Sequence, residues 1–420
     1  MESVGETDVR EGKDAAVDAA HLDEASEGSV APKPGSGSFR TWPVLLMSAA
    51  HLVHDVYTGF LAPLLPLFIR KLSLSLAEAG FLTTVMQFPS LLNPMIGSLA
   101  DRAGGRWFVI LAPTLSAVPM CLAGLAPTYS VLLVLLFAAG LSTSLFHVPA
   151  PVLVARLSGA RRGRGMSLYM TGGELARALS PLVAVSAVAA FGLEGMYSIA
   201  AVALLASGWM YLMLRNVQVS PPRRQHGGMW ETWREMRPLL LPLAGILCAR
   251  GLMHASLTAF LPTFIEQETG SLWMGGAALT VFFSAGVTGV LAAGTLSDRY
   301  GRRRSLLCAL ALAPVALFAF AGSTGPWRVG ALAVTGFTLL STTPVMLAMV
   351  QDRATRSPAA ANGLFMMVSF IARSAIVVLA GLCGDHFGLQ TTYYVSAALG
   401  LMALPLVFLL PASDRRGGDR

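Results

Sequence analysis

His51, His54 and Asp55 form the group of side chains in this sequence whose types and spacing best suit proton chemistry. Their spacing of i, i+3 and i+4 places all three on one face of a helix. Burial raises the affinity of an aspartate for a proton, and a histidine titrates near neutral pH, so such a trio can take up and share a proton. The alternative is a structural role, in which backbone carbonyls satisfy the histidines and a neighbouring helix satisfies the aspartate.

The composition indicates where these side chains lie. Of the 420 residues, 54% are hydrophobic and only 13% are charged, and the mean hydropathy is +0.63. A soluble protein of this length needs more polar surface, so the chain is predicted to be an all-α membrane protein. The cysteines lie inside apolar runs without metal-ligand or disulfide spacing, which favours a packing role; they are Cys121, Cys248, Cys308 and Cys383.

Twelve apolar segments are long enough to cross the hydrocarbon as helices, each about 20 residues in length. The predicted spans are 41–69, 78–100, 107–126, 129–155, 165–191, 195–214, 238–265, 272–296, 305–321, 327–350, 359–383 and 391–410. The first six form a predicted N-terminal bundle over 41–214 and the last six a C-terminal bundle over 238–411.

The segments outside the two bundles differ in composition. Residues 1–40 are rich in acidic and small side chains, which predicts a disordered cytoplasmic tail without a secretory signal. Residues 412–420 are predicted to form a second cytoplasmic tail. Between the bundles, 215–237 carries Trp230, Trp233, Arg234 and Arg237 at helical spacing, which predicts an amphipathic cytoplasmic helix; a solvated linker is the alternative.

Loop charge predicts the orientation of the chain. The loop arginines gather after the even-numbered helices, whereas the odd-numbered loops hold only Arg70, Lys71 and Arg328. Because basic residues in short loops stay in the cytoplasm, both termini are expected on the cytoplasmic side of a bacterial inner membrane. The membrane topology therefore explains the formal net charge of +7, and nucleic-acid binding is not needed to explain it.

Two halves of the chain repeat one motif. Residues 97–106 read G-S-L-A-D-R-A-G-G-R and residues 294–303 read G-T-L-S-D-R-Y-G-R-R, and Asp101 and Asp298 lie 197 positions apart. His54 and His254, and also Arg177 and Arg373, recur at nearly the same offset. A fixed offset in so apolar a chain predicts two pseudo-symmetric six-helix bundles.

This motif resembles the signature loop of the major facilitator superfamily, G-x-x-x-D-R/K-x-G-R/K-R/K. The second copy matches throughout, and the first departs only at Gly105. Other pieces resemble the fosmidomycin-resistance branch; they are His51 to Asp55, Leu145 to His147 with Pro149, Gly172-Gly173, and Ser180-Pro181-Leu182, where Ser180 replaces a usual glycine. The resemblance implies an alternating-access carrier with its site between the halves.

Ionisable residues on the other predicted helices are candidates for the cargo site. A charge at the bilayer centre costs about 2.5 to 3.5 kcal/mol, so it usually lines a cavity or has a partner. Arg373 lies mid-helix, Arg250 lies one turn from His254, and the alternative for Arg250 is to snorkel to the cytoplasmic face. His147 precedes Pro149 on a helix predicted to kink, and it is assigned either to the cargo site or to packing.

Charge balance predicts the sign of the cargo. Glu174 and Arg177, at i and i+3, can neutralise each other, and Glu174 is a further candidate for proton coupling. Asp55 and Glu174 then leave one of the three arginines, Arg177, Arg250 and Arg373, without a counter-charge. Because the planar guanidinium of arginine suits bidentate binding of carboxylate or phosphonate, an anionic small-molecule cargo is expected.

The signature loops are expected to act as a cytoplasmic gate. Its candidate residues are Gly97, Asp101, Arg102, Gly294, Asp298 and Arg299. The acidic residues can face helix N-termini, and the arginines can bridge to carboxylates across the closed side. The alternative is that the basic runs only set topology.

The preferred interpretation is a monomeric secondary transporter that exports a small anionic or amphiphilic compound, such as a phosphonate-type antibiotic, in exchange for protons. The alternative is import of an organic anion by proton symport. A membrane enzyme is disfavoured because His21, His226 and His386 lie outside the apolar cluster, so no metal site is expected. No Walker loop is present, and no cofactor is expected.

Overall fold

A computed structural model describes residues 39–93, 95–96, 106–159, 162–215, 229–353 and 358–411. Within these ranges every long element is a helix. The predicted gate residues Gly97, Asp101 and Arg102 lie outside the described residues, as do nearly all of the two predicted tails and residues 216–228 of the predicted linker.

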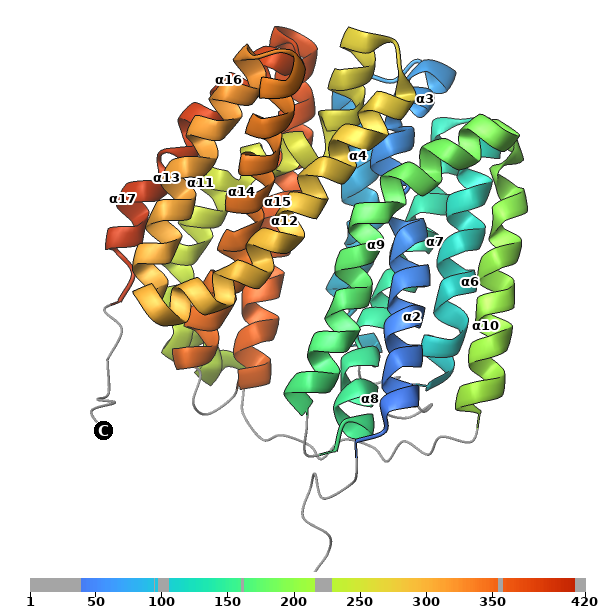
Figure 1. The fold of residues 1–420 in the computed structure, drawn as a ribbon, viewed down its shortest axis with the longest axis horizontal. Coiled ribbons are helices and arrows are strands. Elements are labelled where there is room, and N and C mark those ends of the chain that lie inside the picture. The colour runs from blue at the N-terminus through green and yellow to red at the C-terminus, as the bar shows by residue number, and fades with distance from the viewer. Residues whose placement is uncertain are drawn as a thin grey trace, which may run out of the picture.

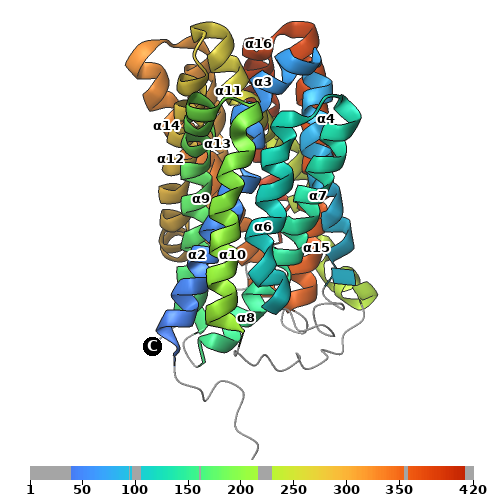
Figure 2. The same cartoon turned by 90° about the vertical axis from the view of Figure 1, so that its right-hand side faces the viewer.

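The first half of the chain forms one group of helices, which lies beside the second group in Figure 1. Its elements are α2 (Thr41–Thr58), α3 (Leu61–Leu72), α4 (Leu76–Gln87), η2 (Phe88–Leu92), α6 (Arg106–Leu122), η3 (Ala123–Leu125), α7 (Tyr129–His147), α8 (Ala150–Leu157), α9 (Arg162–Phe191), η4 (Glu194–Ile199) and α10 (Ala200–Leu214). Helices α2, α6 and α10 contact one another, and α9 packs along α2 (Figure 2).

The second half forms the other group. Its elements are α11 (Met229–Thr269), α12 (Leu272–Tyr300), α13 (Arg302–Gly322), α14 (Gly325–Arg353), α15 (Pro358–Phe387), α16 (Leu389–Gly400) and α17 (Ala403–Phe408). Because α11 begins at Met229, the described end of the predicted linker is helical and continuous with the seventh predicted span.

Eleven helices in the described ranges are long and apolar enough to cross a membrane. The remaining predicted span, 78–100, contains α4 and η2 and then enters residues that the structure does not describe. Helices outside the inter-half contact expose large apolar side chains, for example Leu205 on α10 (75% exposed) and Val315 on α13 (62%). Such surfaces suit lipid rather than water.

Two of the predicted spans are interrupted. The first breaks at Gly59 and Phe60, between α2 and α3, and the fourth breaks at Val148 and Pro149, between α7 and α8. Proline has no N–H to donate to the preceding turn, so a helix commonly kinks there. The interruption lies where the sequence predicts a kink, and His147 is the last residue of α7.

Contacts between the halves connect α4 with α15, α9 with α12, and α3 with α11. Glycines allow the closest approaches. A Cβ atom on Gly80 of α4 would lie 2.7 Å from the carbonyl oxygen of Val377, and one on Gly381 of α15 would lie 2.3 Å from that of Leu76. The hydroxyl of Thr84 also donates to the carbonyl of Ser374 across this seam, at 2.8 Å.

Candidate functional site

The Asp55 carboxylate lies at the centre of a histidine cluster in the first half. Its oxygens lie 3.2 Å from Nε2 of His51, 3.5 Å from Nε2 of His147 and 3.9 Å from Nε2 of His54. The first and last of these side chains share α2 with Asp55, as the spacing predicts. His147 comes from α7, so the structure places it with the proton-coupling candidates rather than beside Arg250.

Backbone carbonyls determine which ring nitrogen of each histidine carries hydrogen. Nδ1 of His51 lies 2.9 Å from the carbonyl oxygen of Tyr169. Nδ1 of His54 lies 3.3 Å from that of Ala112, and Nδ1 of His147 lies 3.0 Å from that of Thr143. A carbonyl only accepts hydrogen bonds, so Nδ1 is the donor in each ring and Nε2 of a neutral ring presents a lone pair.

The resulting cluster is a set of acceptors. Nε2 of His51 and Nε2 of His147 lie 3.3 Å apart, and among the described residues Nε2 of His54 and Oδ1 of Asp55 are buried without a hydrogen-bond partner. Lone pairs and a carboxylate that converge in this way repel one another unless a cation lies between them. The cation can be a shared proton or a metal ion.

Glycines of α9 make room for this cluster. A Cβ atom on Gly173 would lie 2.5 Å from Cε1 of His51, and one on Gly172 would lie 2.2 Å from the carbonyl oxygen of Ser48. The His51 ring stacks on Tyr169, with centroids 4.2 Å apart. The Gly172-Gly173 pair therefore allows α9 to hold His51 in position against α2.

Arg250 and Arg373 supply the positive charge of the second half. Arg250, on α11, is 5% exposed and donates to the Leu339 carbonyl at 3.4 Å and to Oγ1 of Thr343 at 3.0 Å, both on α14. Its side chain therefore extends to a neighbouring helix and not to a headgroup layer, which answers the snorkelling alternative. Arg373 lies in the middle of α15 and is nevertheless exposed.

Neither guanidinium has a carboxylate within 4.0 Å among the described residues. Nε of Arg250 is buried and has no hydrogen-bond partner among the described residues. His254 is half-buried and lies within electrostatic range of both arginines. An anion is the natural partner for such a pair.

Arg177 carries a charge that acts on members of both clusters. It forms an ion pair with Glu174 on its own helix, α9, as the i, i+3 spacing predicts. It also lies within electrostatic range of His147 in the first half and of His254 and Arg373 in the second. Glu174 is thus held by Arg177 and does not join the Asp55 cluster.

The described gate residues interact within one half. Nη1 of Arg302 lies 2.6 Å from Asp298, and Nε of Arg302 lies 3.2 Å from Asp352 on α14. Arg302 thus connects α12, α13 and α14, and neither ion pair crosses to the first half. Gly294 and Arg299 lie on the same end of α12.

The opposite end of the molecule contains contacts that the sequence did not predict. Asp385 of α15 accepts hydrogen bonds from the backbone of Leu76 and Ala77 at the start of α4, at 2.7 and 2.9 Å. Arg70 of α3 forms an ion pair with Glu266 of α11. The capping box of Ser75 and Glu78 marks the start of α4 in the sequence, but it does not indicate a partner in the other half.

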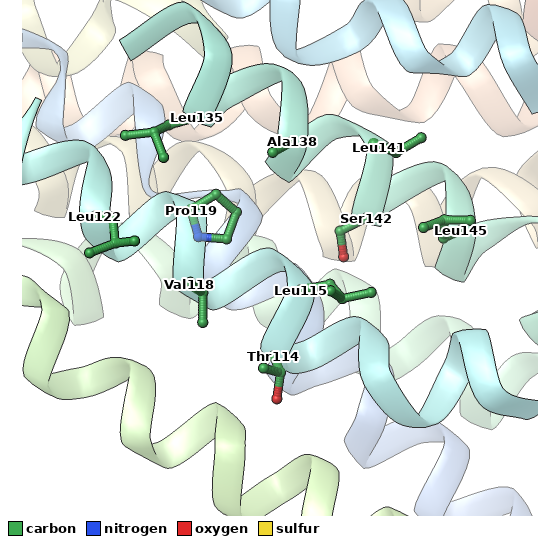
Figure 3. A pocket seen from close by; sticks show the side chains of 10 residues that line it. All are labelled: Thr114, Leu115, Val118, Pro119, Leu122, Leu135, Ala138, Leu141, Ser142 and Leu145. Atoms are coloured by element: carbon green, nitrogen blue, oxygen red, sulfur yellow. The ribbon is translucent and has the colours of Figure 1, made fainter. Parts of the chain in front are cut away.

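A cavity of about 390 Å³ lies between α6 and α7 (Figure 3). Its lining is apolar apart from Thr114 and Ser142, whose hydroxyls already bond to Ser207 and to the Ala112 carbonyl. It contains no charged side chain. It therefore does not suit an anionic cargo.

Comparison with known proteins identifies the class. The model of the Major Facilitator Superfamily matches residues 47–278 and 243–419, so the chain belongs to this superfamily of membrane transporters and is not an enzyme. It is 25% identical over 400 residues to the "Uncharacterized MFS-type transporter YfnC" of Bacillus subtilis (strain 168), covering 91% of this chain and 95% of that protein.

Two further similarities are informative. The fosmidomycin resistance protein of Escherichia coli (strain K12) is 24% identical over 374 residues, covering 86% of this chain and 91% of that protein, which supports the resemblance to that branch. The crystal structure of a bacterial homologue of the human lysosomal transporter Spinster, inward-facing and unoccupied, aligns with a TM-score of 0.77 at 15% identity, covering 90% of this chain and 98% of that one. This likeness supports the twelve-helix fold.

Proposed function

We propose that this transporter exports a small anionic or amphiphilic compound, such as a phosphonate-type antibiotic, in exchange for protons and by alternating access. The observation that carries the proposal is the pair of complementary clusters on facing halves. One is an acceptor set around Asp55 that needs a cation, and the other is a pair of arginines without a carboxylate partner in the part of the chain that the structure describes.

The cargo site consists of Arg250, His254 and Arg373, with Arg177 reaching from the first half. An anionic group bound there neutralises Arg250 and Arg373, which have no carboxylate within 4.0 Å among the described residues. Each hydrogen bond to a charged group contributes about 1.5 to 3 kcal/mol. Asp55, with His51, His54 and His147, takes the coupled proton, and the carrier acts as a monomer.

The energetics of a bacterial inner membrane favour export of an anion by exchange. Moving one proton inward and one monovalent anion outward transfers two positive charges inward. Each charge transferred contributes about 2.3 kcal/mol of driving free energy per 100 mV of membrane potential. A higher proton concentration outside the cell adds to this driving force. The name of the fosmidomycin resistance protein, and those of multidrug resistance proteins that are 23% identical to this chain, also favour export.

Proton symport of an organic anion is the second candidate, and one observation favours it. Arg177 lies within electrostatic range of both clusters. A proton added near His147 therefore increases the positive charge felt at the cargo site, which strengthens anion binding instead of opposing it. Direction of flux separates the two functions.

Flux into inverted membrane vesicles, with fosmidomycin as the labelled probe, tests the proposal. The lumen of an inverted vesicle corresponds to the outside of the cell, so an acidic lumen should drive accumulation. Accumulation driven only by an alkaline lumen would establish the symporter. A flux of the same size with an acidic and with an alkaline lumen would refute proton coupling.

Two variants assign the roles in this assay. Asp55→Asn should abolish gradient-driven accumulation while leaving exchange of labelled for unlabelled cargo, and Glu194→Gln, at a 72% exposed carboxylate side chain, should change neither. Arg373→Ala should raise the KM for cargo about 10- to 100-fold, the equivalent of about 1.5 to 3 kcal/mol, with partial recovery in Arg373→Lys. Wild-type kinetics in both Arg373 variants would remove it from the site.

A further inference from the structure

The donor atoms of His51, Asp55 and His147 have the spacing of a metal coordination shell. Their separations are 3.2 Å (His51 Nε2 to Asp55 Oδ2), 3.3 Å (His51 Nε2 to His147 Nε2) and 3.5 Å (His147 Nε2 to Asp55 Oδ1). Ligands bound to a tetrahedral Zn²⁺ at about 2.0 to 2.1 Å lie about 3.3 Å from one another. The two separations to Asp55 end on different oxygens of its carboxylate, and one donor atom from each residue lies within 4.8 Å of the other two. The three residues can therefore supply three ligands to one ion.

The outer contacts of these residues also match those of a metal site. Metal-binding histidines usually donate their second ring N–H to a carbonyl or carboxylate, which fixes the tautomer and ring orientation. Here the Tyr169 and Thr143 carbonyls accept from Nδ1 of His51 and His147, at 2.9 and 3.0 Å. Nε2 of both rings is thereby left as the free donor atom, and the two Nε2 atoms lie 3.3 Å apart.

His54 provides a fourth donor at the edge of this shell. Its ring is fully buried, its Nδ1 lies 3.3 Å from the Ala112 carbonyl, and its Nε2 lies 3.9 Å from Oδ1 of Asp55. Both Nε2 of His54 and Oδ1 of Asp55 are buried without a hydrogen-bond partner among the described residues. Two unsatisfied acceptors that face the same centre are costly without a cation.

From these contacts we propose that His51, Asp55 and His147, with His54 beside them, bind a divalent transition-metal ion of the zinc class. Imidazole and carboxylate donors select Zn²⁺, Co²⁺ or Ni²⁺ over Mg²⁺ and Ca²⁺, which prefer shells of oxygen. The His147 side chain is 39% exposed, so the donor set is not fully enclosed by protein. In the described part of the chain, no other group of histidine, cysteine and acidic residues brings three donors so close together.

The sequence predicted no metal site because His21, His226 and His386 lie outside the apolar cluster, which leaves no second group of ligands for His51, His54 and Asp55. The structure adds His147 from α7. The proposal is independent of cargo and of the direction of transport, because binding is measured without flux. A metal ion at these atoms takes the place of a shared proton.

Titration of the full-length protein with Co²⁺, in nanodiscs and without a polyhistidine tag, tests the proposal. We expect one equivalent of Co²⁺ to produce the intense visible absorption of tetrahedral cobalt, and one equivalent of Zn²⁺ to remove it. Zn²⁺ at 100 times its Kd should also raise the Tm, because an ion that binds only the folded protein stabilises it. Mg²⁺ and Ca²⁺ should leave the Tm unchanged. Absence of the cobalt band in the wild type would overturn the proposal.

Variants locate the bound ion. His147→Gln and Asp55→Asn should each weaken Co²⁺ binding at least ten-fold, and thermal unfolding without metal should show that both variants fold. His386→Gln is the matched control, because His386 also has its Nδ1 on a backbone carbonyl of its own helix, 3.1 Å from Leu382, but belongs to no donor cluster among the described residues. Equal loss in His386→Gln, or full binding in His147→Gln, would contradict the assignment.

Discussion

Asp385 caps a helix of the opposite half: its carboxylate accepts the backbone N–H of Leu76 at 2.7 Å. The same carboxylate accepts from Ala77, so the first turn of α4 is held by α15. A carboxylate at a helix N-terminus is favoured by the unpaired N–H groups and by the helix dipole. This contact closes one end of the transporter, together with the ion pair of Arg70 and Glu266.

Asp385→Ala should shift the conformational equilibrium away from this closed end. Loss of a helix-capping side chain costs about 0.5 to 2 kcal/mol, which corresponds to roughly a 2- to 30-fold change in population. Spin labels on the ends of α4 and α15 would report the change as a longer inter-label distance. Ser75→Ala is the control, because Ser75 caps the same helix from within its own half. An equal effect in both variants would show that only α4 is weakened.

Gly173→Ala should displace His51 from the Asp55 cluster. The added methyl would lie 2.5 Å from the ring, and overpacking of this kind costs about 1 to 3 kcal/mol. We expect a lower Tm and loss of gradient-driven flux. Gly208→Ala on α10 is the matched control, since its methyl would contact nothing within 4 Å. Wild-type flux in Gly173→Ala would show that the position of His51 is unimportant.

Thr343→Val should weaken cargo binding although it replaces no charged residue. Oγ1 of Thr343 accepts a hydrogen bond from Arg250, so its loss frees the guanidinium to adopt other orientations. A net hydrogen bond is worth about 0.5 to 1.5 kcal/mol, which predicts a KM about 2- to 12-fold higher with kcat little changed. Thr338→Val, on the same helix, removes a hydroxyl that bonds only to its own helix and should leave KM unchanged. Equal KM values in the two variants would exclude positioning by Thr343.

Asp298→Asn should slow turnover while leaving cargo affinity intact. Asp298 and Asp352 both pair with Arg302, so the variant loosens the junction of α12, α13 and α14 without breaking it. Exposed ion pairs contribute up to about 1 kcal/mol, which predicts at most a five-fold decrease in kcat. Steady-state flux measures kcat and KM separately. A raised KM with normal kcat would place Asp298 in cargo binding and contradict a gating role.

The helices and the shared face of His51, His54 and Asp55 follow from the sequence, because hydrophobic length and helical period are local properties. The kink at Pro149 follows for the same reason. The position of His147 beside Asp55 does not follow, since it depends on how α7 packs on α2. The contacts of Asp385 and Arg70 do not follow from the sequence either, because their partners lie on helices of the other half.

Ser180 illustrates the same limit. The sequence shows only that a serine replaces the glycine usual in the resembling family. In the structure its hydroxyl donates to the Val56 carbonyl at 2.8 Å, and a Cβ atom on Gly59 would lie 2.4 Å from its oxygen. The serine therefore joins α9 to the end of α2 close to where the first span breaks.

Ligand binding to the purified protein tests the central claim most directly, namely that a positively charged site between the halves takes an anion. Thermal unfolding is measured with a panel of phosphonates, carboxylates and cationic drugs, in the wild type and in Arg373→Ala. We expect phosphonates or carboxylates to raise the Tm of the wild type and to lose this effect in Arg373→Ala, while cationic drugs leave Tm unchanged. Stabilisation by cationic drugs alone, or anion stabilisation that survives in Arg373→Ala, would contradict the account.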